Sequence, residues 1–296
     1  MSHLRVAVPR KGRPLEAVLQ QVTTSETAAV ADDIISTLRY EKAVTKGKQT
    51  PETDVYDRLA SYSSLADPRE PEFTLLRDDR DGSPRRIVFD SVTIPFDDVD
   101  IQLVGREEPL RSLRKHEFAL GFDSADLVLE EVVSLEPEPL ASLAEINERI
   151  SPVDTDVRVA TGLGDTIYHS LLATPEVCAS TALDRSFVRS YEGSLCISPR
   201  YERLVGAVLG SDALEGIEFA YPEQGVEEET AIAHTGLGVY LTVTGSTARE
   251  NGLVVGDRLF PSETVLLTNV SELDAKTEAL VQQFARAQEE SALPVQ

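Results

Sequence analysis

The chain has 296 residues, 41% of them hydrophobic, which is enough for one large domain or two modest ones with an apolar core. Its 51 acidic residues outnumber 28 Lys and Arg, and the net charge of -23 disfavours binding to nucleic acids and anionic membranes. Two cysteines and four scattered histidines show no metal-ligand spacing, which argues against a zinc or iron site.

The excess of Asp and Glu, with very few lysines among the basic residues, favours adaptation to high salt, where screening softens the self-repulsion. No apolar run approaches the length of a membrane span, and the segment after Met1 shows no secretory signal pattern. We therefore predict a cytoplasmic protein.

The first predicted unit of structure is a strand followed by a helix. Residues 4–8 form an apolar run typical of a buried strand, and residues 15–22 show helical periodicity. Lys11, Gly12 and Arg13 then occupy the strand-to-helix loop, where α/β proteins place ligand loops. A solvated basic turn is the alternative interpretation.

The chain then alternates between polar and apolar segments. Residues 25–70 are polar and interrupted, so we expect helical pieces and a surface insertion there. The alternation that follows predicts a sheet covered by helices. The predicted strands are residues 73–76, 87–89, 101–104 and 118–121, and the predicted helices are residues 110–115 and a segment after Asp123.

Acidic and proline residues between positions 131 and 156 predict a connection to a second lobe. The first lobe is expected to comprise residues 1–150 and 255–296, with the insertion at about 25–70, and the second lobe residues 151–254. Further strands are predicted at residues 157–160, 195–197, 217–220, 238–242 and 264–268, and further helices at residues 200–209, 227–233 and 271–287. The ligand is expected in a cleft between the lobes.

A hydroxyl-rich turn follows the strand predicted at residues 238–242. Gly245 permits a sharp turn, and the helix after it would offer free backbone N–H groups and a positive dipole end. Thr244, Ser246 and Thr247 add hydroxyl groups, so the turn is suited to a phosphate. The alternative is an ordinary capped helix start, since Ser and Thr are favoured there.

Taken together, the Lys-Gly-Arg loop and the Thr-Gly-Ser-Thr turn resemble those of ATP phosphoribosyltransferase, the first enzyme of histidine biosynthesis. Residues 120–126, 198–201 and 225–227 are similar to further segments of that family, in the same order. The resemblance implies an α/β fold of the two-lobed, type II periplasmic-binding-protein-like kind. It leaves residues 25–70 and 137–194 poorly matched.

The resemblance also implies ligands and roles. Thr244, Gly245, Ser246 and Thr247 would hold the 5-phosphate of phosphoribosyl pyrophosphate, and Glu227 would lie near the ribose or magnesium ion. Glu227 is also compatible with an ordinary acidic first turn of a helix. By the same resemblance, Lys11, Gly12 and Arg13 would meet the purine nucleotide or pyrophosphate, with Mg²⁺ as the cofactor. Asp126 is interpreted as a helix-start residue without ligand contact.

The chain departs from the family before the turn. The family has carboxylates there that hydrogen-bond the ribose, and this chain has Gly236, Tyr240 and Val243 at the matching positions. Three functions are compatible with the resemblance: a phosphoribosyltransferase, a non-catalytic relative that acts as a ligand-binding or regulatory subunit, or a scaffold subunit of a larger enzyme. In each case we expect a homo-oligomer, or a hetero-oligomer with a regulatory subunit.

Overall fold

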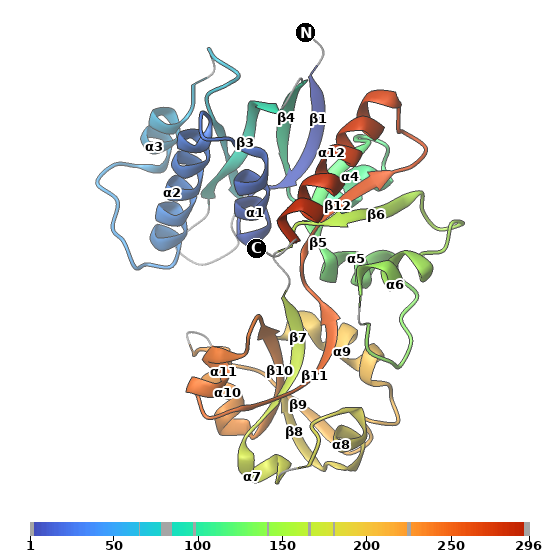
Figure 1. The fold of residues 1–296 in the computed structure, drawn as a ribbon. Coiled ribbons are helices and arrows are strands. Elements are labelled where there is room, and N and C mark those ends of the chain that lie inside the picture. The colour runs from blue at the N-terminus through green and yellow to red at the C-terminus, as the bar shows by residue number, and fades with distance from the viewer. Residues whose placement is uncertain are drawn as a thin grey trace. The chain divides into compact units, whose positions relative to one another are not determined.

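The computed structural model describes residues 3–64, 66–77, 85–96, 99–140, 142–164, 167–179, 181–223 and 226–292. Strands and helices alternate along the chain and form two sheets, which confirms the predicted α/β class (Figure 1). The chain divides into two compact units. Unit 1 comprises residues 1–123, 156–163 and 264–296, and unit 2 comprises residues 124–155 and 164–263.

The described part of unit 1 contains a seven-stranded sheet. Its first strand pairs in parallel with two neighbours, and the strands at the β2 end form antiparallel pairs. The order across the sheet is β2 (Glu72–Arg77), β3 (Arg85–Phe96), β4 (Val99–Arg106), β1 (Leu4–Pro9), β5 (Leu120–Ser124), β12 (Thr264–Asn269) and β6 (Val157–Gly162).

Helices cover both faces of this sheet. The apolar sides of α1 (Arg13–Val22), α2 (Ala28–Thr45) and α12 (Ala275–Ala292) share one core with Val6 and Val8 of β1, whereas Leu113 of α4 (Pro109–Arg114) packs near Ala7 on the opposite face. This opposition follows from the alternation of side chains along a strand. The aromatic ring of Phe284 in α12 stacks on that of Phe96, with ring centroids 4.8 Å apart.

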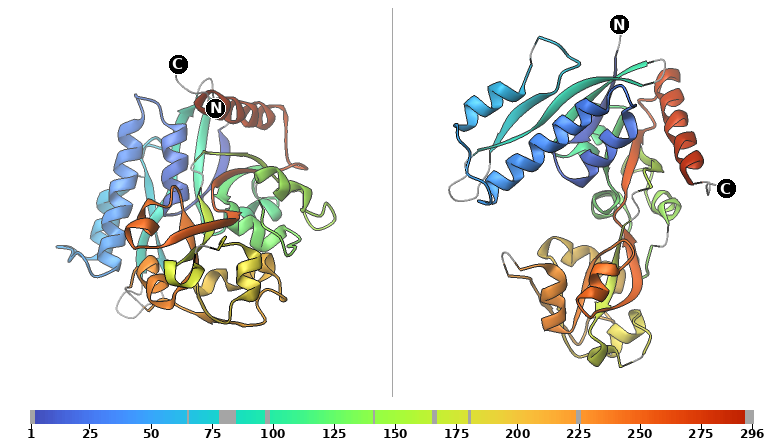
Figure 2. Two further views of the ribbon diagram at one scale, coloured as in Figure 1. Left: turned by 60° about the horizontal axis from the view of Figure 1, so that its bottom comes forward. Right: turned by 60° about the vertical axis from the view of Figure 1, so that its left-hand side comes forward.

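Residues 25–70 contain α2 and α3 (Val55–Tyr62), which agrees with the helical pieces expected there. The expectation of a surface segment does not hold for α2, because its Ala31, Ile34 and Ile35 are buried in the core of unit 1. These three residues recur at helical spacing and form the apolar stripe of an amphipathic helix. Helix α2 packs against strand β3 and lies beside α1 (Figure 2).

The described part of unit 2 contains a five-stranded sheet. Its order is β11 (Val254–Pro261), β7 (Tyr168–Ala173), β10 (Leu237–Thr242), β8 (Gly193–Cys196) and β9 (Ile217–Ala220). Strands β7 and β11 have no counterpart among the predicted strands. The helices of this unit are α5 (Ala125–Val132), α6 (Leu143–Glu148), α7 (Pro175–Cys178), α8 (Arg185–Ser190), η1 (Pro199–Tyr201), α9 (Glu202–Leu209), α10 (Glu228–Thr235) and α11 (Ser246–Glu250).

The bounds of the two units differ from those of the predicted lobes. Residues 124–150 and 255–263 group with unit 2, and residues 156–163 group with unit 1. Within unit 2, the backbone N–H of Ala125 in α5 donates to the carbonyl of Glu263, which follows β11. Such pairings between distant segments cannot be read from the composition of a connecting stretch.

Candidate functional site

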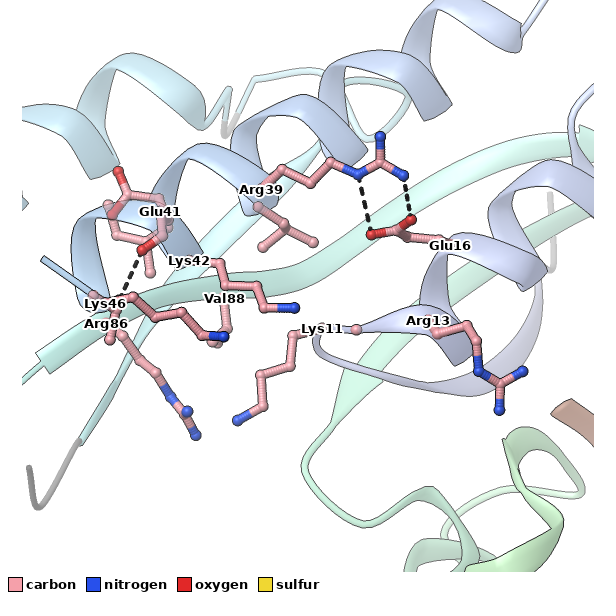
Figure 3. Close-up of a pocket in the computed structure, with 13 residues that line it drawn as sticks. Lys11, Arg13, Glu16, Arg39, Glu41, Lys42, Lys46, Arg86 and Val88 are labelled. Carbon is pink, nitrogen blue, oxygen red and sulfur yellow. Dashed lines mark hydrogen bonds and ion pairs between the residues drawn. The ribbon is translucent and has the colours of Figure 1, made fainter. Parts of the chain in front are cut away.

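A pocket of about 470 Å³ lies within unit 1, beside the loop between β1 and α1 (Figure 3). Three elements line it: the start of α1, one face of α2 and the first part of β3. We call it the cationic pocket, because basic side chains predominate in its wall. Its lining residues are Lys11, Gly12, Arg13, Glu16, Leu38, Arg39, Glu41, Lys42, Thr45, Lys46, Arg86, Ile87 and Val88.

The predicted Lys11–Gly12–Arg13 loop lies at the N-terminus of α1. Gly12 is the N-cap residue and has φ of +83°, a left-handed value that a side chain disfavours. Arg13 is the first residue of the helix. A proline lies in the first turn, where the backbone N–H that proline lacks would have no partner within the helix. The ammonium Nζ of Lys11 lies 3.4 Å from Oε1 of Glu107. The structure thus confirms the strand-to-helix position of this loop.

The rest of the charge in the pocket comes from segments that the sequence did not indicate. Arg39 and Lys42 of α2 and its C-cap residue Lys46 are spaced three and four residues apart, which places them on the same side of the helix. Arg86 reaches the pocket from β3, and its Nη2 lies 3.4 Å from Glu107 Oε1. The sequence signal for this cluster is the scarcity of lysine in the rest of the chain.

The two acidic residues of the pocket wall are engaged by arginines. Oε2 of Glu16 accepts a hydrogen bond of 2.6 Å from Nη2 of Arg39. Glu41 is buried and accepts two hydrogen bonds from Arg58 of α3, at 2.8 and 3.1 Å. These arginines neutralise the carboxylates, so that positive charge predominates on the remaining wall.

The predicted phosphate turn, residues 244–247, joins β10 to α11 in unit 2. Gly245 is buried with φ of +71°, and a Cβ there would lie 2.8 Å from Cγ2 of Val255. The side chains of Thr244, Ser246 and Thr247 are exposed. Hydroxyl groups therefore surround a backbone turn that only glycine adopts without strain.

Two further side chains stabilise this turn. Arg249 Nη1 donates to the carbonyl of Thr244 at 2.9 Å, and Asn251 Nδ2 donates to the carbonyl of Thr247 at 3.0 Å. Arg249 and Asn251 therefore support the turn and the short helix that follows it. The hydroxyl of Thr244 lies 3.1 Å from that of Ser246, so the hydroxyls also interact with one another.

Asp126 is a buried residue of the first turn of α5. Its carboxylate accepts hydrogen bonds from the hydroxyl of Tyr201 at 2.7 Å, from the N–H of Leu127 at 3.0 Å and from the hydroxyl of Ser124. These contacts agree with the interpretation of Asp126 as a helix-start residue with a structural role.

Glu227 is the exposed N-cap residue of α10, and its side chain makes no capping hydrogen bond within the described residues. Tyr240 lies on the adjacent strand β10. Burial, followed by the nearby carboxylates of Glu228, Glu229 and Glu227, raises the pKa of the Tyr240 hydroxyl to about 12. The first turn of α10 therefore places acidic side chains near Tyr240.

Across the described ranges, no group of three or more His, Cys, Asp or Glu residues has the arrangement of a metal site. In the same residues, no helix has the length and apolar character needed to cross a membrane.

The family comparison covers nearly the whole chain. A family model described as halobacterial ATP phosphoribosyltransferase matches residues 1–295. The chain belongs to this family. The match includes the Lys11 loop, the segment from residue 25 to 70 and the turn at residues 244–247. The resemblance inferred from the two loops is thereby confirmed. The comparison with curated proteins found no match.

Solved structures that match the chain include an ATP phosphoribosyltransferase of the HisG:HisZ complex from Thermotoga maritima, at 17% identity and a TM-score of 0.38, covering 97% of each chain. The regulatory domain of a LysR family regulator from N. meningitidis matches at 13% identity and a TM-score of 0.36, covering 66% of this chain and 83% of that one. An ancestral cationic amino acid solute-binding protein matches at 9% identity and a TM-score of 0.36, covering 66% and 74%.

This halobacterial ATP phosphoribosyltransferase family member retains the turn but has Gly236, Tyr240 and Val243 where acids were expected. Gly236 ends α10 with φ of +99°, and Val243 is 63% exposed after β10. Neither can accept a hydrogen bond from a sugar through its side chain. Tyr240, in contrast, lies close to the carboxylates of α10.

Proposed function

We propose that the protein is an active ATP phosphoribosyltransferase, which joins ATP to the ribosyl group of phosphoribosyl pyrophosphate and releases pyrophosphate. The family match over residues 1–295 is the observation that carries this proposal. In the reaction, N1 of the adenine attacks C1 of the sugar, the new N–C bond forms, and the bond from C1 to the pyrophosphate oxygen breaks. The leaving pyrophosphate keeps the electron pair of that bond.

The chain's own residues would act by positioning and electrostatics, and no covalent nucleophile is required. In unit 2, the hydroxyls of Thr244, Ser246 and Thr247 would donate to the 5-phosphate. The buried Gly245 lets the backbone approach that phosphate closely, because no side chain intervenes. In unit 1, Lys11 would contribute positive charge toward the nucleotide or pyrophosphate.

Magnesium is the cofactor that we propose for the reaction. Mg²⁺ is commonly bound by substrate phosphates with one or two protein carboxylates, so it does not need a ready-made protein cage. Glu227 fits this requirement, because its exposed carboxylate makes no capping bond within the described part of the chain. When bound, the ion would offset the charge of the leaving pyrophosphate.

The rival proposal is a non-catalytic relative, since the carboxylates that orient the ribose are missing from β10. The acids beside Tyr240 favour catalysis over this rival. Burial is the largest cause of the raised pKa of the Tyr240 hydroxyl. The carboxylates of Glu228 and Glu229, on the adjacent helix α10, are the next largest causes. Carboxylates from the helix would thus supply the acceptors that the strand lacks.

Association with a regulatory subunit is a further part of the proposal. The Thermotoga maritima protein is described as a HisG:HisZ complex. We propose that this chain likewise assembles as a homo-oligomer or with a regulatory partner, in the cytoplasm.

The test is a pyrophosphate-release assay with ATP, phosphoribosyl pyrophosphate and Mg²⁺ in molar KCl, together with calorimetric binding of phosphoribosyl pyrophosphate. Thr247→Val should raise the KM for phosphoribosyl pyrophosphate roughly tenfold or more, the effect of losing a hydrogen bond to a charged group. Thr181→Val is the matched control, since Thr181 is exposed elsewhere in unit 2. Binding without pyrophosphate release would establish the non-catalytic rival.

A further inference from the structure

The distribution of lysines in the chain is uneven. The sequence contains six lysines, at positions 11, 42, 46, 48, 115 and 276. Three of these six line the cationic pocket. The chain has a net charge of -23 and few lysines, yet half of its lysines lie together. Because like charges repel one another, we expect an anionic ligand to offset this repulsion.

We propose that the cationic pocket binds a chain of two or more linked phosphates through Lys42, Lys46 and Arg86, acting with Lys11. The inference rests on the proposed function and deepens it: the resemblance pointed only to the Lys11 loop, whereas Lys42 and Lys46 belong to a segment that it left poorly matched. These residues would hold the phosphate chain of a substrate or of the released product.

The orientation of the side chains supports this assignment. The ammonium groups of Lys11, Lys42 and Lys46 and the guanidinium of Arg86 point toward one another across the pocket, whereas Arg13 points away from them (Figure 3). Within the described residues, no carboxylate forms an ion pair with Lys42 or Lys46.

Arg86 provides a second observation. Its Nε is buried and has no hydrogen-bond partner within the described residues, although its Nη2 lies 3.4 Å from Glu107. A buried polar group without a partner is costly, so such groups are rare and call for an explanation. Arg86 also lines the pocket, where a phosphate can form charge-assisted bonds with its guanidinium group.

The carboxylates of the pocket do not cancel this charge. Glu16 is paired with Arg39, and Glu41 is paired with Arg58 of α3. Glu107 lies 3.4 Å from both Lys11 and Arg86. Lys42 and Lys46 form no ion pair within the described residues, and they remain as compact point charges. Lysines of this kind bind phosphate in other proteins.

The dimensions of the pocket also agree with a polyphosphate. A volume of about 470 Å³ falls within the range of small-molecule sites, which is roughly 300–1,000 Å³. Four cations drawn from three separate elements carry more charge than a single phosphate would require. Leu38, Ile87 and Val88 add an apolar surface against which a base or sugar attached to the phosphates can pack.

The experiment measures binding of pyrophosphate, ATP, phosphoribosyl pyrophosphate and inorganic phosphate by calorimetry in molar KCl. The test variant combines Lys42→Gln with Lys46→Gln. The control variant combines Lys115→Gln with Lys276→Gln, which removes the same charge at two exposed lysines outside the pocket. Circular dichroism establishes that both variants fold.

We expect at least one of the three polyphosphate ligands to bind the test variant ten- to a hundredfold more weakly, with the control variant unchanged. The ligand that weakens identifies which phosphate chain the pocket holds. Equal affinity of all three ligands for the test variant and the original protein would overturn the proposal. So would binding of inorganic phosphate as tight as that of the polyphosphates.

The two proposals fail in different ways. If the original protein releases no pyrophosphate but the test variant loses affinity for a polyphosphate, the proposed reaction is wrong and the pocket assignment stands. If pyrophosphate is released normally and the test variant binds every ligand as tightly as the original, the reaction stands and the pocket assignment is wrong.

Discussion

Replacing Arg58 with leucine should destabilise unit 1 strongly. Arg58 and Glu41 form a two-pronged ion pair, and their side chains are only 10% and 4% exposed. Breaking such a pair leaves a buried carboxylate without its cation, which costs about 3–5 kcal/mol. We expect about 3 kcal/mol, the lower end of this range, because the hydroxyl of Tyr62 still donates to Glu41 at 3.2 Å.

The assay is denaturant unfolding followed by circular dichroism in molar KCl. Arg39→Leu is the matched control: its hydrogen bond to Glu16 is shorter, at 2.6 Å, but its side chain is 64% exposed, so the loss should be much smaller. The double variant Glu41→Gln with Arg58→Leu should recover part of the stability lost in Arg58→Leu. Equal losses for Arg58→Leu and Arg39→Leu would refute the reasoning from burial.

Three further predictions concern backbone strain, titration and capping. Gly245→Ala should cost more stability in thermal unfolding than Gly252→Ala, because both have positive φ but only the first Cβ meets a neighbouring side chain; equal losses would contradict this. In absorbance titration of tyrosinate, Tyr62→Phe and Tyr240→Phe should each remove a group that ionises near pH 12. Asp54→Ala should cost about 1 kcal/mol in denaturant unfolding, since its carboxylate caps α3; no change would count against that cap.

The sign of the tyrosine effect follows from linkage. Burial comes first, and the carboxylate of Glu41 second, in raising the pKa of Tyr62 from 10.0 to about 12 in the folded protein. The folded state then holds this proton more tightly than the unfolded state. The resulting stability is fully present below pH 10 and is lost as pH rises from 10 through 12. Stability that stays constant over this interval would contradict the assignment.

Local patterns in the sequence were sufficient for much of the fold. The apolar run at residues 4–8 and the helical period after it predicted β1, α1 and the loop that joins them. Strand β11 was missed, and its pairing with β7 is interrupted by register shifts that disturb the alternation of side chains. The alternation of apolar and polar residues, on which strand prediction depends, does not indicate where such register shifts occur.

The candidate site was harder to predict than the fold. Lys11 was found because it belongs to a loop with a recognisable position, whereas Lys42 and Arg86 lie on a helix and a strand with ordinary surface patterns. They meet only because α2 packs on β3 through its buried Ile34 and Ile35. Which side chains meet in this way depends on tertiary packing, and the sequence of a single segment does not contain that information.

The rarity of lysine also has a practical consequence. Amine-selective acylating reagents modify lysine side chains and the chain's α-amino group, so this protein offers them few targets, of which Lys11, Lys42 and Lys46 gather in one place. Mass spectrometry of the partly acylated protein would therefore detect few modified sites, which can be told apart easily. Protection of these three amines, measured against Lys115 and Lys276, would report occupancy of the pocket under any solution condition in which the protein is folded.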